Sequence, residues 1–112
     1  MTEGRLPTHL WIAAGLARCS QQGVPATVVR RGERQSGAVL LKLAMQDRFF
    51  RVLTQARDVR GKLGWMGALD GATVPEADAD AYIGRAVRRD PDLWVVEIEH
   101  REGWHPFVDG TY

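Results

Sequence analysis

Residues 38–55, AVLLKLAMQDRFFRVLTQ, decide the fold, because apolar and polar side chains alternate along them with a period of two. The first half, Ala38 to Met45, predicts a strand with Lys42 on one face and four apolar side chains on the other, Val39, Leu41, Leu43 and Met45. Gln46-Asp47 is a short connection, so the second half, Arg48 to Gln55, is expected to lie antiparallel to the first.

Further strands are predicted on both sides of this pair. Residues 26–31 are rich in β-branched side chains and end in the turn-forming segment 32–37. A polar loop, 57–61, leads to a strand around 62–69. Short connections favour a four-stranded antiparallel meander. A fifth strand at 93–99 places Trp94, Val96 and Ile98 on one face, and the sequence leaves open which edge of the sheet it joins.

One predicted helix precedes the first four strands in the sequence, and a second helix follows them. The first is expected at about 8–22, with Thr8 as its N-cap and an inner face of His9, Ile12, Ala13, Leu16 and Cys19. The second follows Thr73-Val74-Pro75-Glu76, which has the pattern of a capping box, and ends at Asp90-Pro91. Its predicted buried stripe consists of Ala79, Tyr82, Ile83, Ala86 and Val87.

The predicted order is therefore α-β-β-β-β-α-β. It indicates an α+β fold with a mostly antiparallel sheet of about five strands and both helices packed on one face. The chain of 112 residues fits a single domain, 1–112. Residues 100–112 are expected to form a tail held over the domain by aromatic side chains, with 110–112 frayed.

The composition of the chain argues against several classes of function. A net charge of +1 argues against general nucleic-acid affinity, which usually accompanies a clear basic surplus. Cys19 is the only cysteine, so no internal disulfide is possible, and an unpaired thiol suits a reducing compartment. The sequence shows no signal peptide, and its most apolar run, residues 10–17, is too short to cross a bilayer. We therefore expect a cytoplasmic protein without membrane contact.

Several segments carry a resemblance to a known family: Arg5 to Trp11, Leu69-Asp70-Gly71 with Val74-Pro75-Glu76-Ala77, Ala81 to Ile83, and Arg89 to Glu97. The most specific part is Arg89-Asp90-Pro91-Asp92-Leu93-Trp94-Val95. The chain resembles domain-of-unknown-function family 1491, an uncharacterised group of small alphaproteobacterial proteins, over essentially its whole length. The resemblance implies a bacterial cytoplasmic protein of about this size. It implies no activity, cofactor or catalytic residue.

No pattern in the sequence predicts catalysis. His9 and Cys19 share a helix face but lie about 15 Å apart along the axis at 1.5 Å per residue, too far for a dyad. The three histidines, His9, His100 and His105, have no metal-ligand spacing. The glycines of 61–67 match neither a phosphate loop nor a dinucleotide fingerprint. We therefore predict no cofactor and no metal, and an enzyme is the less favoured class.

The outer face of the predicted meander is the main candidate for function. Leu40, Phe49 and Leu53 would lie on it, uncovered by the helices. An open, partly apolar sheet face is typical of an interface, so the leading hypothesis is a non-enzymatic protein-interaction module that binds a second copy or another protein.

Basic side chains from neighbouring strands support an alternative hypothesis for the same face. If the strands pair in order, a cationic row would form from Arg30 (or Arg31), Lys42, Arg51 and Lys62, beside Trp65. Such a row suits a small anionic ligand or single-stranded nucleic acid. A solvated face with scattered apolar residues is the third interpretation of this pattern.

Overall fold

The computed structural model describes residues 6–107, in which two helices and six strands follow one another. Apart from a two-residue strand before the second helix, which was not predicted, their order is the predicted one. The first half contains α1 (Thr8–Gln21), β1 (Ala26–Arg30), β2 (Val39–Ala44) and β3 (Phe49–Arg57). The second half contains β4 (Leu63–Gly67), the two-residue β5 (Val74–Pro75), α2 (Glu76–Arg89) and β6 (Trp94–Glu99). The predicted fold class, two helices with a mostly antiparallel sheet, is confirmed.

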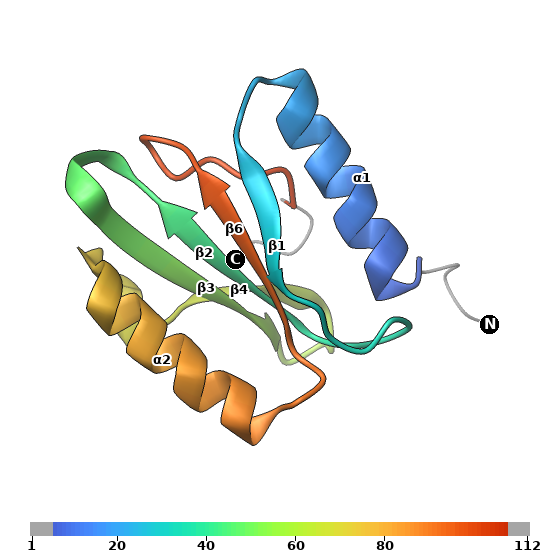
Figure 1. Ribbon diagram of the computed structural model, residues 1–112. Helices are drawn as coiled ribbons and strands as arrows, with labels where there is room; N and C mark the ends of the chain where they lie inside the picture. Colours follow the sequence, from blue (N-terminus) through green and yellow to red (C-terminus); the bar gives the residue numbers. More distant parts are fainter. Residues whose placement is uncertain (1–5, 108–112) are drawn as a thin grey trace.

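The strands form one sheet in the order β1-β6-β2-β3-β4, with β5 paired to β3 outside this path. The meander is confirmed for β2, β3 and β4, which are antiparallel neighbours. It is wrong for β1, because β6 lies between β1 and β2 and pairs parallel with β2. The last strand therefore joins neither edge but the interior of the sheet (Figure 1).

The composition of β6 explains its interior position. Trp94, Val95, Val96 and Ile98 are all buried, so both faces of this strand lie under other groups. A strand that is apolar on both faces is typical of the centre of a covered sheet, whereas an edge strand needs polar groups to stay soluble. The edge strand β1 instead alternates between half-buried and exposed side chains.

The two helices cover opposite faces of the sheet, so the prediction that they share one face is wrong. Ile12 and Cys19 of α1 pack with the odd-numbered residues Leu41 and Leu43 of β2. The α2 side chains lie over the even-numbered residues of β2 and β3, in a second cluster with Leu40, Phe50, Val52 and Val95. Because successive side chains of a strand point to opposite faces, these two clusters lie on opposite sides of the sheet.

The start of each helix also differs from the prediction. No side-chain cap bonds to the first turn of α2; Pro75 is its N-cap residue, and the Glu76 carboxylate binds Lys42 instead of completing a capping box. Pro7, not Thr8, precedes α1, and the Thr8 hydroxyl donates to the carbonyl of Gly37, 3.0 Å away. The predicted buried stripe of α2 is confirmed, with Ala79 and Ala86 at its centre.

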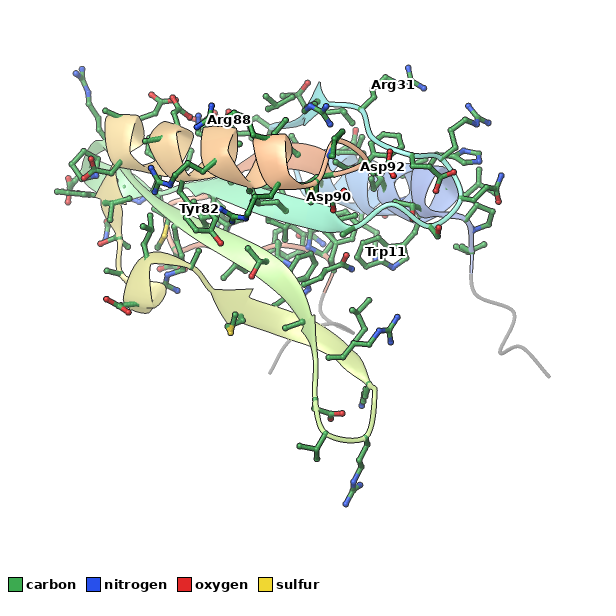
Figure 2. The ribbon with its side chains drawn as sticks, turned by 90° about the horizontal axis from the view of Figure 1, so that it is seen from below. Trp11, Arg31, Tyr82, Arg88, Asp90 and Asp92 are labelled. Carbon is green, nitrogen blue, oxygen red and sulfur yellow. The ribbon has the colours of Figure 1, made fainter. Side chains whose placement is uncertain are left out.

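The pairing of β2 with β3 does not reach the first residue of β2 or the last residues of β3. Their pairing stops at Leu40 and Thr54, and the last residues of β3, from Gln55 to Arg57, pair with β4 alone. The β3–β4 hairpin consequently projects away from the helices and the rest of the sheet (Figure 2). Beyond the split, the backbone N–H of Val39 donates to the side-chain oxygen Oε1 of Gln55 at 2.7 Å.

Candidate functional site

The apolar patch predicted on an open face does not form. Leu40 is 1% exposed and lies under α2, whereas Leu53 packs against the cluster on the α1 side. Phe49 is 43% exposed at the beginning of β3, beside Pro75 of β5. The prediction failed because α2 covers the face that carries Leu40, whereas Leu53 lies on the opposite face, so the three side chains form no common patch.

The predicted basic row is divided between the two faces. Lys42 is paired in register with Val52 and lies on the α2 side, whereas Arg51 is paired with Leu43 on the α1 side. The Arg51 side chain is half-buried, and its Nε atom is buried without a hydrogen-bond partner among the described residues. These two cations therefore cannot bind one ligand from a shared face.

The other members of the predicted row are also apart from one another. Arg30 donates through one guanidinium nitrogen to the carbonyls of Pro91 and Leu93. Lys62 lies in the loop before β4. Trp65 is 3% exposed, and its indole N–H donates to the carbonyl of Phe107 at 2.7 Å. Arg30 and Trp65 thus hold the fold together.

Lys42 is the centre of an ion cluster between the sheet and α2. Its side chain is 7% exposed, and its Nζ atom lies 2.7 Å from Glu76, 2.8 Å from Asp80 and 3.7 Å from Glu97. Burial alone lowers the pKa of Lys42, but the hydrogen bonds to Asp80 and Glu76 and the charge of Glu97 outweigh it, and the pKa is raised. Lys42 stays protonated and bound to these carboxylates, which leaves it unsuited to binding an external anion.

A cavity of about 490 Å³ lies on the α1 side where β3 leaves β2; we call it the Trp11 cavity. Its volume falls in the range of pockets that bind small molecules, roughly 300–1,000 Å³. Apolar side chains make up most of its described lining: Leu6, Trp11, Ala38, Val39, Ala56 and Leu63. Figure 2 shows Trp11 on the side of the sheet from which the hairpin projects.

Aromatic rings hold Trp11 in place at this cavity. Its ring centroid lies 4.6 Å from that of Phe107 and 6.3 Å from that of Trp65. Phe107 is fully buried, and the preceding residue, Pro106, accepts a hydrogen bond from Arg18 of α1. The prediction that aromatic side chains hold the tail against the domain is confirmed through Phe107; residues 110–112, predicted to fray, lie outside the described residues.

The polar part of the lining consists of Gly37 and the side chains of Thr8, Ser36, Gln55 and Arg57. All four of these side chains have hydrogen-bond partners within the protein. Thr8 donates to Gly37, Ser36 bonds with the Glu33 carboxylate, and the Gln55 oxygen accepts from Val39. Arg57 is the only charged side chain in the described lining, and one of its guanidinium nitrogens donates to the Gly61 carbonyl at 2.7 Å.

A smaller hollow of about 220 Å³ lies on the opposite face, beneath Tyr82 and Arg89 of α2. Both hollows include Ala38, Val39 and Gln55 in their linings. Gln55 therefore stands between them, and its bond to Val39 closes the sheet where no strand pairing does.

Two reactive side chains lie away from the Trp11 cavity lining. His105 is 8% exposed, burial lowers its pKa, and its Nδ1 accepts from the backbone N–H of Phe107, so the neutral imidazole is favoured. Cys19 is 1% exposed, and burial raises the pKa of its thiol against a smaller opposing effect of Arg18. Neither side chain is placed to act on a molecule in the cavity.

Over residues 6–107 no group of three or more His, Cys, Asp or Glu side chains is arranged to hold a metal ion. In the same part of the chain, no helix has the length and apolar character needed to span a bilayer.

Within Arg89 to Val95, the segment that carries the resemblance most strongly, residues Asp90 and Asp92 have a structural role. The Asp90 carboxylate accepts from the N–H of Asp92, and the Asp92 carbonyl accepts from the N–H of Glu33 in the β1–β2 loop. Gly32 and Gly37 bring that loop so close to Asp92 that a β-carbon at either position would overlap its carbonyl oxygen. This motif therefore positions the start of β6 and one wall of the cavity.

Sequence reasoning missed the cavity and left Trp11 without an assigned place. A tryptophan at the border between the polar and apolar faces of a helix was the available signal, since such a residue is half-buried and needs a partner for its ring. Gln55 gave no signal, because its bond to Val39 depends on where two strands separate.

The comparisons with known proteins identify relatives over nearly the whole chain. The profile of the family described as "Protein of unknown function (DUF1491)" matches residues 6–108. A crystal structure of a DUF1491 family protein from Caulobacter crescentus CB15 is 40% identical, with a TM-score of 0.84, and the match covers 96% of this chain and 98% of that chain. An NMR structure of a DUF1491 family protein from the same organism is 42% identical, with a TM-score of 0.80, and the match covers 95% and 94%.

A more distant relative has the same architecture. The solution structure of protein Atu0922 from A. tumefaciens is 27% identical, has a TM-score of 0.73, and the match covers 86% of each chain. No protein with a curated description matches the chain.

Proposed function

The chain belongs to the DUF1491 family of proteins of unknown function, and on this premise we propose that it is a non-enzymatic protein-interaction module whose contact surface is centred on the Trp11 cavity. The cavity itself carries the proposal: a concave apolar surface with a half-buried tryptophan, open to a partner on the side where the hairpin projects.

The residues around the cavity have the composition of a protein interface. Leu6 at its border is 53% exposed, and Leu10, next to Trp11 in α1, is 47% exposed. Tryptophan and arginine are enriched among the residues that contribute most to binding, and an apolar centre within a polar rim is the usual arrangement. Trp11 and Arg57 occupy these two positions.

A non-enzymatic role is supported by the lining of the cavity. Its described lining includes no Asp, Glu, His, Cys or Lys that could act as a general acid or base, and the hydroxyls of Thr8 and Ser36 are bonded to the Gly37 carbonyl and the Glu33 carboxylate. The alternative hypothesis, an anionic ligand on a basic strand row, has less support because Lys42 is bound to three carboxylates of the same chain. A cytoplasmic location is part of the proposal, since a single buried thiol suits a reducing compartment.

Site-specific photocrosslinking in bacterial cells tests this function. A benzophenone amino acid replaces Leu10, the exposed residue that precedes the lining residue Trp11 in α1, and a matched variant carries it at Ala81, an exposed position of α2. We expect a discrete crosslinked product from position 10 and none from position 81. A product of twice 12.5 kDa would identify the partner as a second copy.

The test needs a control for folding, and one outcome would contradict the proposal. Both variants must keep the circular dichroism and thermal unfolding of the unmodified protein, so that the benzophenone has not displaced α1. If folded variants with the group at Leu6, Leu10 and Leu63 all give no product beyond that of Ala81, the proposed contact surface is wrong.

A further inference from the structure

The electrostatics of the Trp11 cavity indicate the chemistry of the partner segment, an inference that rests on the proposed function. We infer that the cavity receives an apolar side chain adjacent to an aspartate or glutamate, and that Arg57 binds the carboxylate. The proposed partner is therefore an acidic segment with one apolar side chain. It is bound at the end of β3, where Arg57 lies.

Arg57 is held ready for such a contact. Its bond to the Gly61 carbonyl crosses the turn between β3 and β4 and uses one of the five guanidinium N–H groups. The residue is exposed and lines an otherwise uncharged cavity. A guanidinium with its orientation fixed loses less conformational entropy when it binds a carboxylate, and its flat shape permits two parallel hydrogen bonds.

The carboxylates on the two neighbouring loops are already engaged. Glu33 accepts from the backbone N–H groups of Gln35 and Ser36, and these bonds lower its pKa. Asp58 accepts from the N–H groups of Arg60 and Lys62 at the tip of the hairpin. Both carboxylates are thus bound to backbone N–H groups of their own loops. The hydrogen bond of the Arg57 guanidinium goes to the Gly61 carbonyl and not to either carboxylate.

The segments that border the cavity carry a local positive charge. Residues 33–38 and 55–63 contain Arg34, Arg57, Arg60 and Lys62 against Glu33 and Asp58, four positive charges minus two negative ones, or +2. The whole chain has a net charge of only +1. An acidic segment is therefore attracted to this end of the molecule, whereas the acidic first turn of α2 lies on the other face with Lys42.

The apolar part of the partner follows from the volume. A space of about 490 Å³ lined by Trp11, Val39 and Leu63 accepts a large aliphatic or aromatic side chain together with part of its neighbour. Burial of that side chain supplies affinity, and the contact with Arg57 selects an acidic neighbour over a neutral one.

Two short peptides test this chemistry directly: acetyl-Phe-Glu-amide and acetyl-Phe-Gln-amide, which differ only in the charge of the second side chain. Each is titrated at millimolar concentration into uniformly ¹⁵N-labelled full-length protein, and the indole N–H signal of Trp11 is followed. We expect the glutamate peptide to bind about two to five times more tightly than the glutamine peptide, in line with the strength of an exposed ion pair.

Variants assign the selectivity to one residue. In Arg57→Gln the two peptides should bind equally, whereas Arg60→Gln, which removes a neighbouring charge outside the lining, should keep most of the difference. Leu63→Trp should weaken the binding of both peptides alike, because the larger ring occupies part of the cavity. Equal affinities for the two peptides in the unmodified protein, a difference that survives in Arg57→Gln, or no Trp11 shift with either peptide would each overturn the inference.

The outcome also separates this inference from the proposed function. If Leu10 crosslinks to a protein but the glutamate peptide has no advantage, the interaction role stands and the assigned partner chemistry fails. If the glutamate peptide binds in an Arg57-dependent manner but no position crosslinks in cells, the cavity recognises the carboxylate and the protein-interaction role fails.

Discussion

The ring of Phe107 occupies the space in which a β-carbon on Gly15 would lie. Gly15 is buried in the middle of α1, and Phe107 belongs to the segment that follows β6. The absence of a side chain at position 15 thus lets the C-terminal part of the chain pack directly against the first helix. This contact also supports Trp11, whose ring packs against the same Phe107 ring.

Replacement of Gly15 by alanine should destabilise the protein. A methyl group would displace the Phe107 ring, and overpacking of this kind costs about 1–3 kcal/mol. Urea unfolding followed by tryptophan fluorescence measures the change. Gly84→Ala is the matched control, because only the flexible end of Arg88 lies near that position, 3.7 Å away; it should stabilise α2 by up to about 1 kcal/mol. A stable Gly15→Ala protein with unchanged fluorescence would contradict the described packing.

Replacement of Lys42 by methionine should also lower stability. The apolar replacement leaves Glu76, Asp80 and Glu97 close together without a counter-ion, although their partial exposure lets water screen the repulsion. We expect a loss of about 1–3 kcal/mol in the free energy of unfolding. Arg88→Met, on the exposed side of α2, should change it by less than about 0.5 kcal/mol. Equal effects of the two substitutions would show that the ion cluster adds nothing to the free energy of unfolding.

Acid should weaken the fold through His105. Its folded-state pKa is lowered by burial, so the unfolded chain takes up a proton near the ordinary value of about 6.5 while the folded chain does not. The stabilisation is fully present above that pH and declines as the pH falls toward the lower folded-state pKa. His105→Asn keeps an acceptor for the Phe107 N–H without titrating.

Unfolding free energies between pH 7.5 and 5.5 measure this effect. The slope should be smaller in His105→Asn than in the unmodified protein. An unchanged slope in His105→Asn would assign the pH dependence to another group.

The Cys19 thiol should react slowly in the folded protein. It is 1% exposed, and burial raises its pKa, so little thiolate is accessible near neutral pH. Labelling with a chromogenic disulfide should be complete within minutes in 6 M guanidinium and orders of magnitude slower in buffer. The rate in buffer should rise in parallel with destabilisation in Gly15→Ala. Rapid labelling of the native protein would show that α1 opens readily.

The order of elements followed from the sequence, because alternation within each strand and the apolar stripe of α2 are local properties. The arrangement of layers did not. Leu40 was predicted on an open face, although apolar residues on both sides of β2 and β6 are what a doubly covered sheet requires. The adjacent apolar pairs Leu40-Leu41 and Val95-Val96 carried that signal, but the prediction assumed a cover on one face only.

Most of the candidate site could not be predicted from the sequence, because it is formed by contacts between distant segments of the chain. The partners of Lys42 come from α2 and β6, and the Trp11 cavity joins α1, the loop before β2 and the β3–β4 hairpin. Such contacts depend on the exact point at which β3 leaves β2, which no local pattern specifies.

The interior position of β6 has a consequence for how the protein is made. β1 emerges early from the ribosome, but its neighbour in the sheet is β6, which ends about 70 residues later at Glu99. Until β6 has been synthesised, β1 and one edge of β2 lack the strand with which they pair in the finished sheet. The nascent chain therefore presents open edges, which other chains or chaperones can bind, until β6 has left the ribosome and been inserted between them.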